Sequence, residues 1–582
     1  MVTHFSKVAV AGQSVFDRWF LTFVVLAAIV VRIAAIAMVT GLSTPPTFQS
    51  DDSEYDVYAW NLAQGRGYRG QSIDVTDRDH LTAYRPPVPS LCFAAVYMIF
   101  GHSYPAARIL NAIFGGLTVL LIERIGRSCF DVRVARIAAT LFAFSPSAIY
   151  FSQGLLSEPL AAFQVALVVW CSLGIRSPRG WVWAILTGVT FGLLLLNKPG
   201  FLFVLPFLPF WALVVCGRNW NLWRRITTIP LALGLTCLPW IVRNLIVMHA
   251  FIPFGTGGGQ LLLSTCNRIV VNDPELYGYS VMDSFLPEYQ TALRAPDNEI
   301  ARDAVAKSLG VAWLKANPDQ WFYLVRMKFL RFWEPWLHRP VRSLGVRAAE
   351  GYLMLILIFM VGALPAVTTR FFREQNPALL IQAMFAGNTV MAMIFHGQPR
   401  YRFPIESLCL LLASGGLVAA FDFLRADHRT ARAKVLFQKT GIFGSVVIVL
   451  VVIFTAASKF DDTRVEKYRT KGCELRLDAI AHAVAIYQQS EGGMPASLES
   501  LIPQYLPNVD HLHCPKHSLD WHDYESLTET DPYHFGHLAI SYQLEVDPQV
   551  AGRYHVIETE ARHPGGRLSR SLSPVPPSRH ER

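Results

Sequence analysis

Charged residues are scarce in this chain. Only 16% of its 582 residues are Asp, Glu, Lys or Arg, whereas 52% are hydrophobic and the mean hydropathy is +0.31. A single soluble core stops growing well below this length, so the composition excludes one large soluble domain. The excess of apolar residues indicates a chain that spans a membrane several times.

Cysteine is also scarce outside the apolar segments. Most of the nine cysteines lie in or beside apolar runs, where a thiol behaves as a small hydrophobe. Cys266, Cys473 and Cys514 lie outside these runs. Two interpretations stay open for Cys473 and Cys514: free thiols, or a disulfide formed in an oxidising compartment. The nearby His511, His513 and His517 lack a second cluster at metal-site spacing, so no metal site is predicted there.

Apolar runs recur along the chain at lengths that approach a membrane crossing, which needs roughly 30 Å of helix at about 1.5 Å per residue. We count about eleven such runs, with an error of about two. They cover residues 20–39, 106–122, 134–151, 159–174, 181–196, 201–216, 226–242, 352–367, 378–395, 403–421 and 442–455. The first run contains Arg32 and lacks a small-residue cleavage motif, so we expect a retained anchor.

Arginine and lysine gather in every second connection between these runs. The clusters lie at residues 124–136, 176–179, 218–225, 370–373 and 425–439. Because positive residues favour the cytoplasmic side, these connections and the N-terminus, with Lys7 and Arg18, are predicted to be cytoplasmic. The same alternation places the C-terminal region on the outer side of the cell (inner) membrane.

Two long outer connections, residues 41–104 and 243–349, hold many of the remaining polar residues. Short outer turns are expected at residues 153–158, 197–200 and 396–402. Within the first connection, the apolar run Pro86–Phe100 reaches only about 22 Å as a helix, too short to span comfortably. We therefore expect it to lie at, or dip into, the membrane interface.

Two adjacent carboxylates, Asp51 and Asp52, lie in the first outer connection. Carboxylates this close disfavour joint ionisation, so a raised pKa suited to proton transfer is expected for one of them. The alternative is a solvated N-cap of the helix that follows. A charged pair just outside the hydrocarbon is a candidate reaction centre.

Several short motifs resemble those of a superfamily of membrane enzymes. They are Ser50–Tyr55, Tyr84–Pro87, Leu156–Leu160, Pro239–Asn244 and Arg400–Glu406. Their order and their agreement with the predicted topology resemble the GT-C glycosyltransferases, in particular the protein mannosyltransferase and aminoarabinose transferase branch, over residues 15–425. The resemblance implies a GT-C-like helical membrane domain that transfers a sugar from a polyprenyl-phosphate donor.

The resemblance also implies roles for the acidic residues of the first loop. Asp51, four residues before Tyr55, corresponds to the general base, while Asp52 stands where a small residue is usual. Three interpretations of Glu54 stay open: it orients the acceptor, it shares a divalent cation with the Asp pair, or it is a helix surface charge. Tyr55 is a candidate substrate-binding residue, and no other cofactor is expected.

Transfer from a lipid phosphate needs cationic groups for the phosphate that leaves. The candidates on the predicted outer face are Arg85, Lys198, Arg243, Arg400 and Arg402. Arginine offers a bidentate fork and lysine a point charge, whereas snorkelling at a span end is the alternative for the last three arginines. Glu158, in a short outer turn, is expected to pair with one of these cations.

The composition of the chain and its predicted organisation change after residue 425. A cytoplasmic linker and a last span are expected over 426–458. Residues 459–560 are predicted to form a helix, a Pro-rich turn region and a small sheet, with strands around Leu538–Glu545 and Tyr554–Glu558. This part resembles the heads of type IV pilins and type II secretion pseudopilins, which implies a small extracytoplasmic α+β domain, although no prepilin cleavage site precedes the span. Residues 561–582, rich in Pro, Ser and Arg, are predicted to be disordered.

Two functions stay open for this predicted polytopic α-helical membrane protein. The leading hypothesis is a glycosyltransferase whose partners are membrane lipid, a lipid-linked sugar donor and an unidentified protein or lipid-glycan acceptor. The alternative is a protein that binds or translocates a lipid-linked glycan without catalysis. The net charge of +9 is largely accounted for by the inner-face clusters and gives no support to nucleic-acid binding. The sequence predicts no oligomeric state.

Overall fold

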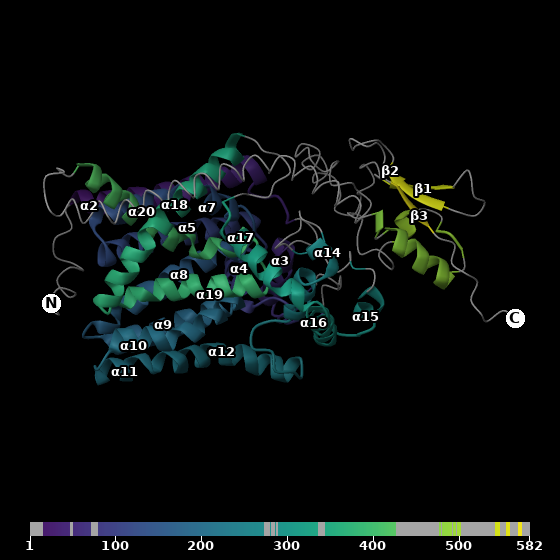
Figure 1. Cartoon of the computed structure of the whole chain (residues 1–582), viewed down its shortest axis with the longest axis horizontal. Coiled ribbons are helices and arrows are strands. Elements are labelled where there is room, and N and C mark those ends of the chain that lie inside the picture. The colour runs from purple at the N-terminus through teal and green to yellow at the C-terminus, as the bar shows by residue number, and fades with distance from the viewer. Residues whose placement is uncertain are drawn as a thin grey trace. The chain divides into compact units, whose positions relative to one another are not determined.

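The computed structural model describes residues 15–46, 51–70, 80–272, 280, 286, 289–335, 344–425, 477–478, 480–491, 493–495, 498–501, 542–546, 554–558 and 569–572 (Figure 1). The chain divides into two compact units. The first holds residues 1–256, 325–337 and 344–455, and the second holds residues 257–324, 338–343 and 456–582. Each unit is described by itself.

The first unit is a set of apolar helices. Its main helices are α2 (Val15–Ala35), α3 (Asp51–Ala63), α4 (Pro87–Phe100), α5 (Tyr104–Cys129), α6 (Val132–Ala143), α7 (Pro146–Phe151), α8 (Glu158–Leu173), α9 (Gly180–Leu195), α10 (Leu208–Cys216), α11 (Trp220–Ile226), α12 (Thr228–Val247), α18 (Leu344–Arg373), α19 (Leu380–Ile394) and α20 (Phe403–Arg425). Short π or 3₁₀ segments accompany them at η1 (Ile36–Thr40), η2 (Gly174–Arg176), η3 (Pro199–Phe207), η8 (Pro377–Leu379) and η9 (Pro399–Tyr401).

Eight helical stretches of the described residues are long and apolar enough to cross a membrane. They are Trp19–Thr40, Tyr104–Cys129, Glu158–Arg176, Pro199–Cys216, Trp220–Val247, Ala348–Arg373, Pro377–Ile394 and Phe403–Asp422. Each coincides with one of the predicted apolar runs. This number of spans indicates an integral membrane protein.

Three of the eleven predicted runs do not add to these eight. Residues 134–151 form two short helices, α6 and α7, because Pro146 lacks the amide N–H that a continuous helix needs and disfavours helical backbone before it. Residues 181–196 form α9, whose 16 residues fall short of a full crossing. Residues 442–455 lie outside the described part of the chain.

Two helices form the centre of the first unit. α8 packs against α5, α9 and α20, and α20 also packs against α6 and α18 (Figure 1). α8 is apolar around most of its circumference, the pattern of a helix that is buried on all sides. Its polar first residue, Glu158, is fully buried as well, so the helix presents a carboxylate at one end of the central layer.

The helices α3 and α4 pack against each other beside the spans. α3 begins with three acidic residues, Asp51, Asp52 and Glu54, which suit the positive end of a helix dipole. α4 begins at Pro87, a residue favoured in the first helical turn. The predicted interfacial helix is thus present as α4, and its depth in a membrane stays a prediction.

The second unit contains short helices and a small sheet. Its helices include α13 (Gly258–Thr265), α14 (Arg268–Asn272), α15 (Gln290–Arg294), α16 (Glu299–Ala316), η7 (Pro318–Gln320) and η10 (Leu498–Leu501), while α17 (Trp321–Trp333) begins in this unit and ends in the first. Residues 480–491 are helical. The antiparallel sheet has the strand order β1 (Tyr542–Val546), β2 (Tyr554–Glu558), β3 (Ser569–Leu572).

The sheet agrees with the expected strands and corrects the expected tail. β1 overlaps the predicted strand at residues 538–545 and β2 coincides with the predicted strand at residues 554–558. β3 lies in the segment predicted to be disordered, so that prediction is wrong for these four residues. β3 pairs with β2 from Tyr554 opposite Leu572 to Ile557 opposite Ser569. Backbone pairing with a neighbouring strand does not depend on the polar composition that suggested disorder. The resemblance to pilin heads stays a prediction.

Candidate active site

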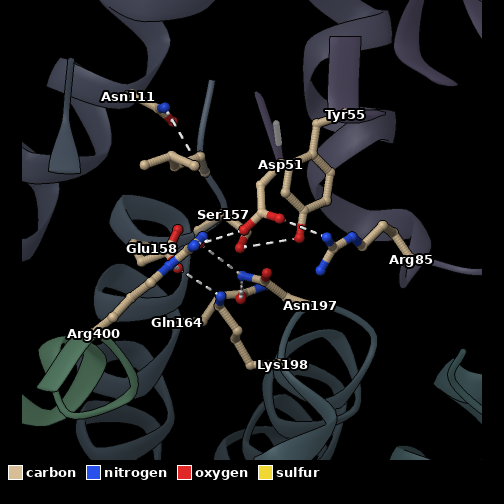
Figure 2. Close-up of polar contacts among 11 residues, drawn as sticks. Asp51, Tyr55, Arg85, Asn111, Ser157, Glu158, Gln164, Asn197, Lys198 and Arg400 are labelled. Atoms are coloured by element: carbon tan, nitrogen blue, oxygen red, sulfur yellow. Dashed lines mark hydrogen bonds and ion pairs between the residues drawn. The ribbon is translucent and has the colours of Figure 1, made fainter. Parts of the chain in front are cut away.

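The carboxylate of Asp51 lies between two guanidinium groups (Figure 2). Its Oδ1 is 2.5 Å from Nη2 of Arg85, and its Oδ2 is 2.6 Å from Nη1 of Arg400. Asp51 comes from the first turn of α3, Arg85 from the segment just before α4, and Arg400 from η9. One carboxylate therefore joins two segments more than 300 residues apart in the sequence.

Both arginines are also held from the other side. Nε of Arg85 is 2.5 Å from Oε2 of Glu54, and Nε of Arg400 is 2.6 Å from Oε1 of Glu158. The same Oε1 of Glu158 is 2.8 Å from Nζ of Lys198, so Glu158 does pair with predicted outer-face cations. The result is a continuous chain of ion pairs in which acidic and basic groups alternate. Figure 2 shows the part of it that runs from Arg85 to Lys198.

Short connections between helices bring these side chains together. Glu158 is the first residue of α8, and Lys198 lies in the turn between α9 and η3. Lys198 precedes Pro199, and the β or polyproline conformation favoured before proline ends the helical backbone there. The side chains of Glu54 and Glu158 are 3% and 0% exposed, whereas that of Asp51 is 26% exposed. Asp51 is therefore the most accessible of these three carboxylates.

Asp52 makes a different contact. Its Oδ2 accepts a hydrogen bond of 3.2 Å from the backbone N–H of Leu155, in the turn before α8. Among the described residues, no donor is bound to its Oδ1. The space beside it is tight, since a Cβ atom on Gly154 would lie 2.2 Å from Oδ2. Asp52 thus links the start of α3 to the turn at residues 152–157.

The two adjacent aspartates have pKa values shifted in opposite directions. Burial by itself raises the pKa of Asp51, but the positive charges of Arg85, Arg400 and Lys198 outweigh it and hold that pKa well below the usual range. Burial and the negative charge of Asp51 raise the pKa of Asp52 to about 6. One member of the pair does have the raised pKa expected from the sequence, and it is Asp52.

The cations keep hydrogen-bonding capacity after these pairs are formed. Arg85 uses Nε and Nη2, and Arg400 uses Nε and Nη1, so each retains one terminal nitrogen that donates to no described residue. Burial lowers the pKa of the Lys198 ammonium, although Glu158 opposes the shift. These donors are the groups with which an anionic ligand would make contact.

A second layer of hydrogen bonds supports this chain of ion pairs. The hydroxyl of Tyr55 donates to Oγ of Ser157 at 3.2 Å. Nδ2 of Asn197 donates to Oε1 of Gln164 at 2.7 Å, and Asn197 directly precedes Lys198 (Figure 2). These contacts tie α3 and the turn after α9 to α8.

The structure brings eight of the ten predicted site residues together and places two elsewhere. Arg243, on α12, donates to the backbone oxygens of Thr82 and Tyr68, each at 2.9 Å. Arg402 is 1% exposed and donates to the backbone oxygens of Phe332 and Glu334, at 2.8 and 2.7 Å. Both arginines therefore hold backbone segments rather than joining the chain of ion pairs.

Sequence reasoning did not single out three residues that shape the site. Gly154 provides space for Asp52, and Asn197 supports the turn that carries Lys198. Tyr68 donates from its hydroxyl to the backbone oxygen of Arg85 at 3.0 Å. Asn197 was recognisable as the neighbour of Lys198 in a short turn, whereas nothing in the local sequence marks Gly154 or Tyr68.

A divalent cation was one of the open interpretations for the acidic residues. Among the described residues, no group of three or more His, Cys, Asp or Glu side chains is arranged to hold a metal ion. Glu54 is itself buried and pairs with the partly exposed Arg85, so the interpretation of Glu54 as a helix surface charge is wrong. The site as described is built from ion pairs between side chains.

Residues 84–246 match the family model described as dolichyl-phosphate-mannose-protein mannosyltransferase. This segment is less than half of the chain and contains Arg85, Glu158 and Lys198 but neither Asp51 nor Arg400. No curated protein sequence matches the chain.

Two solved structures are similar to this chain at low sequence identity. The oligosaccharyltransferase AglB from Archaeoglobus fulgidus, in complex with an inhibitory peptide and a dolichol-phosphate, has a TM-score of 0.45 and 15% identity, over 83% of this chain and 60% of that chain. ArnT from Cupriavidus metallidurans, bound to undecaprenyl phosphate, has a TM-score of 0.33 and 15% identity, over 71% of this chain and 82% of that chain. This chain spans less than two thirds of AglB.

Proposed function

We propose that this protein is a membrane glycosyltransferase of the GT-C type. It transfers a sugar from a polyprenyl-phosphate donor to a hydroxyl or amide acceptor, of protein or of a lipid-linked glycan, on the outer face of the cell membrane. A carboxylate of the Asp51–Asp52 pair is the general base, and Asp51 is the residue that we assign to this role. The match of residues 84–246 to the mannosyltransferase family model supports the reaction class.

One observation carries the proposal: an acidic group lies within ion-pair distance of two arginines, each with a terminal nitrogen that donates to no described residue. Sugar transfer from a lipid phosphate needs this juxtaposition, because proton removal from the acceptor and charge stabilisation on the phosphate occur in the same transition state. Arginine is well suited to the second task because its planar fork matches phosphate oxygens. Lys198 adds a third cation beside Arg400.

The reaction that fits these groups is a displacement at the anomeric carbon of the sugar. Asp51 accepts the proton of the acceptor, and the acceptor heteroatom forms the new bond to the anomeric carbon. The bond between that carbon and the phosphate oxygen breaks, and its electron pair stays on the phosphate. Arg85, Arg400 and Lys198 stabilise the negative charge that develops on this leaving group.

Two buried acceptors in the site also fit a ligand rich in hydroxyl groups. Oε2 of Glu158 and Oδ1 of Asn197 are buried and accept no hydrogen bond from the described residues. Both residues lie beside Lys198, where a sugar attached to a bound phosphate would come close. Hydroxyl donors of a sugar, or water in its place, would satisfy these oxygens.

The proposal is tested in cells that lack this chain. Mass analysis of envelope glycans and lipids should show a glycosylated species that disappears without the protein and returns with the wild type. Asp51→Asn should not restore it, although the purified variant should still bind undecaprenyl phosphate. If Asp51→Asn restores the species fully, the protein is a binder or translocator without catalysis, and the proposal is wrong.

A further inference from the structure

The positive charges of the three cations in these ion pairs are already balanced by carboxylates. Arg85, Lys198 and Arg400 face Asp51, Glu54 and Glu158 through ion pairs of 2.5–2.8 Å. Asp52 adds a fourth carboxylate nearby. Arg108 faces Asp52 and adds a fourth cation. With all of these groups ionised, the formal sum is four positive against four negative charges, so the site holds no surplus positive charge for a phosphate.

Asp51 occupies the two arginines in the way that a phosphate would. Each of its oxygens takes one terminal nitrogen, Nη2 of Arg85 and Nη1 of Arg400. A phosphate likewise presents two oxygens on one atom and forms the same charge-assisted hydrogen bonds. Two anions that share one pair of guanidinium groups repel each other, so a bound phosphate disfavours the carboxylate of Asp51 in the same place.

Among the ion-paired carboxylates, Asp51 is the one that can leave most easily. Its side chain is 26% exposed, whereas those of Glu54 and Glu158 are 3% and 0% exposed. The arginines do not depend on Asp51 for their positions. Nε of Arg85 is held by Glu54, and Nε of Arg400 is held by Glu158.

We infer that Asp51 competes with the donor phosphate for Arg85 and Arg400, and that donor binding releases this carboxylate so that it can accept the acceptor proton. The inference rests on the proposed function and adds that the base becomes active only after the donor has bound. While Asp51 bridges the arginines, both of its oxygens are occupied and it is a poor proton acceptor. It becomes a competent base only when the phosphate has taken its place.

The test is direct binding of undecaprenyl phosphate to the purified full chain in detergent, with undecaprenol as the uncharged control lipid. Asp51→Asn removes the competing charge, so it should bind the lipid phosphate at least about ten-fold more tightly than the wild type, while losing transfer. Asp51→Ser, which also lacks the charge, should behave in the same way. Melting curves from tryptophan fluorescence establish that each variant is folded.

Glu54→Gln is the matched control, because it removes one negative charge from the same arginine. Since Glu54 supports Arg85 rather than competing at its terminal nitrogen, this variant should bind the lipid phosphate no more tightly than the wild type. Equal tightening by Asp51→Asn and Glu54→Gln would overturn the inference, because removal of any negative charge would then suffice. Unchanged or weaker binding by both folded Asp51 variants, with intact wild-type binding, overturns it too.

The inference and the proposed function fail in different ways. If the wild type and all variants bind undecaprenyl phosphate no better than undecaprenol, the proposed function falls and the inference falls with it. If the wild type binds the lipid phosphate and supports transfer, but the Asp51 variants do not gain affinity, only the inference falls.

Discussion

Gly154 lies directly against the carboxylate of Asp52, and a Cβ atom on Gly154 would be 2.2 Å from Oδ2 of Asp52. We expect Gly154→Ala to push Asp52 from its hydrogen bond with Leu155 and to shift the first turn of α3. Overpacking of this kind costs about 1–3 kcal/mol of stability. A displacement of about 1 Å at a reacting group lowers a rate by as much as about a hundred-fold. Transfer measured in complemented cells or in detergent should therefore fall by at least about ten-fold.

Gly234→Ala is the control for this substitution. Gly234 lies within α12, and a Cβ atom there would meet nothing within 4 Å. Alanine should be accepted with unchanged transfer and equal or slightly higher melting temperature, because alanine favours helix more than glycine does. Equal loss of transfer in both variants would show that the contact between Gly154 and Asp52 is not the cause.

The raised pKa of Asp52 predicts a pH-dependent difference in stability between the wild type and Asp52→Asn. The pKa is about 6 in the folded protein and 3.8 for the free carboxyl, so the folded chain binds the proton more tightly than the unfolded chain. As pH rises from about 4 to about 6, the unfolded carboxyl is ionised first, and this group makes folding less favourable. Asn keeps an oxygen that can accept from Leu155 but does not titrate.

Asp52→Asn should consequently become more stable than the wild type as the pH rises from about 4 to about 6. We expect the difference in unfolding free energy to be near zero below pH 4 and to reach about 1–3 kcal/mol above pH 6. Melting temperatures of both proteins, measured from pH 4 to pH 8 in the same detergent, supply the comparison. Charged groups that face Asp52 are Asp51, Glu158, Arg400 and Arg108, and they are common to both proteins, so their titration largely cancels. A constant difference at all pH values would contradict the assignment.

The positions of the main site residues follow from features that a sequence displays. Asp51, Lys198 and Arg400 lie beside apolar runs, and the alternation of positive clusters puts all three connections on one side. Charged side chains at one interface pair because an unpaired charge there is costly. The meeting of these residues was therefore predictable, although which carboxylate oxygen meets which nitrogen was not.

Other features depend on contacts that the sequence does not display. Arg243 and Arg402 lie beside span ends in the same way as Arg400, but their guanidinium groups satisfy backbone oxygens. Which carbonyl groups lack partners depends on how helices end in three dimensions. Pro146 is visible in the sequence, yet its apolar neighbours made one span look more plausible than the two helices that form.

Arg243 and Tyr68 form a support for Arg85 that is open to a double-mutant test. Arg243 donates to the backbone oxygen of Tyr68, and its guanidinium lies 5.7 Å from the centre of the Tyr68 ring. The Tyr68 hydroxyl donates to the backbone oxygen of Arg85. We expect Tyr68→Phe and Arg243→Lys each to weaken binding of undecaprenyl phosphate by about ten-fold or less, at about 1 kcal/mol for each lost hydrogen bond.

Arg243 acts on Arg85 only through Tyr68, so the effects of Tyr68→Phe and Arg243→Lys on binding should not add. The double variant should bind only slightly more weakly than the worse single variant, as neighbours in one network do. If Arg243 instead contacted the phosphate itself, its substitution would add fully to the loss from Tyr68→Phe. Binding of the four proteins, measured at one salt concentration, separates these cases.

Arg400 and Arg402 are two residues apart, but the same substitution is expected to affect mainly ligand binding at Arg400 and mainly stability at Arg402. Arg402 is fully enclosed, and its guanidinium pairs with Glu406 at 3.3 Å and also donates to two backbone oxygens at the end of α17. Arg402→Gln removes the positive partner of the buried Glu406, which keeps only Ser147 as a side-chain donor, and the donors to two backbone oxygens. It should therefore lower the unfolding free energy by about 3–5 kcal/mol. Arg400 is 31% exposed, so Arg400→Gln should lower it by less while removing most lipid-phosphate binding.

Both arginines were predicted from the sequence to bind phosphate. Comparing Arg400→Gln with Arg402→Gln distinguishes a residue that contacts the ligand from one that supports the structure. Melting temperature and undecaprenyl phosphate affinity are measured on the same preparations. At a temperature where Arg402→Gln is still folded, its affinity should stay within about three-fold of the wild type, because in the structure Arg402 is tied to Glu406 and the backbone. A folded Arg402→Gln protein that has lost binding as completely as Arg400→Gln would show that Arg402 reaches the donor, and the separation of roles drawn from the ion pairs would be wrong.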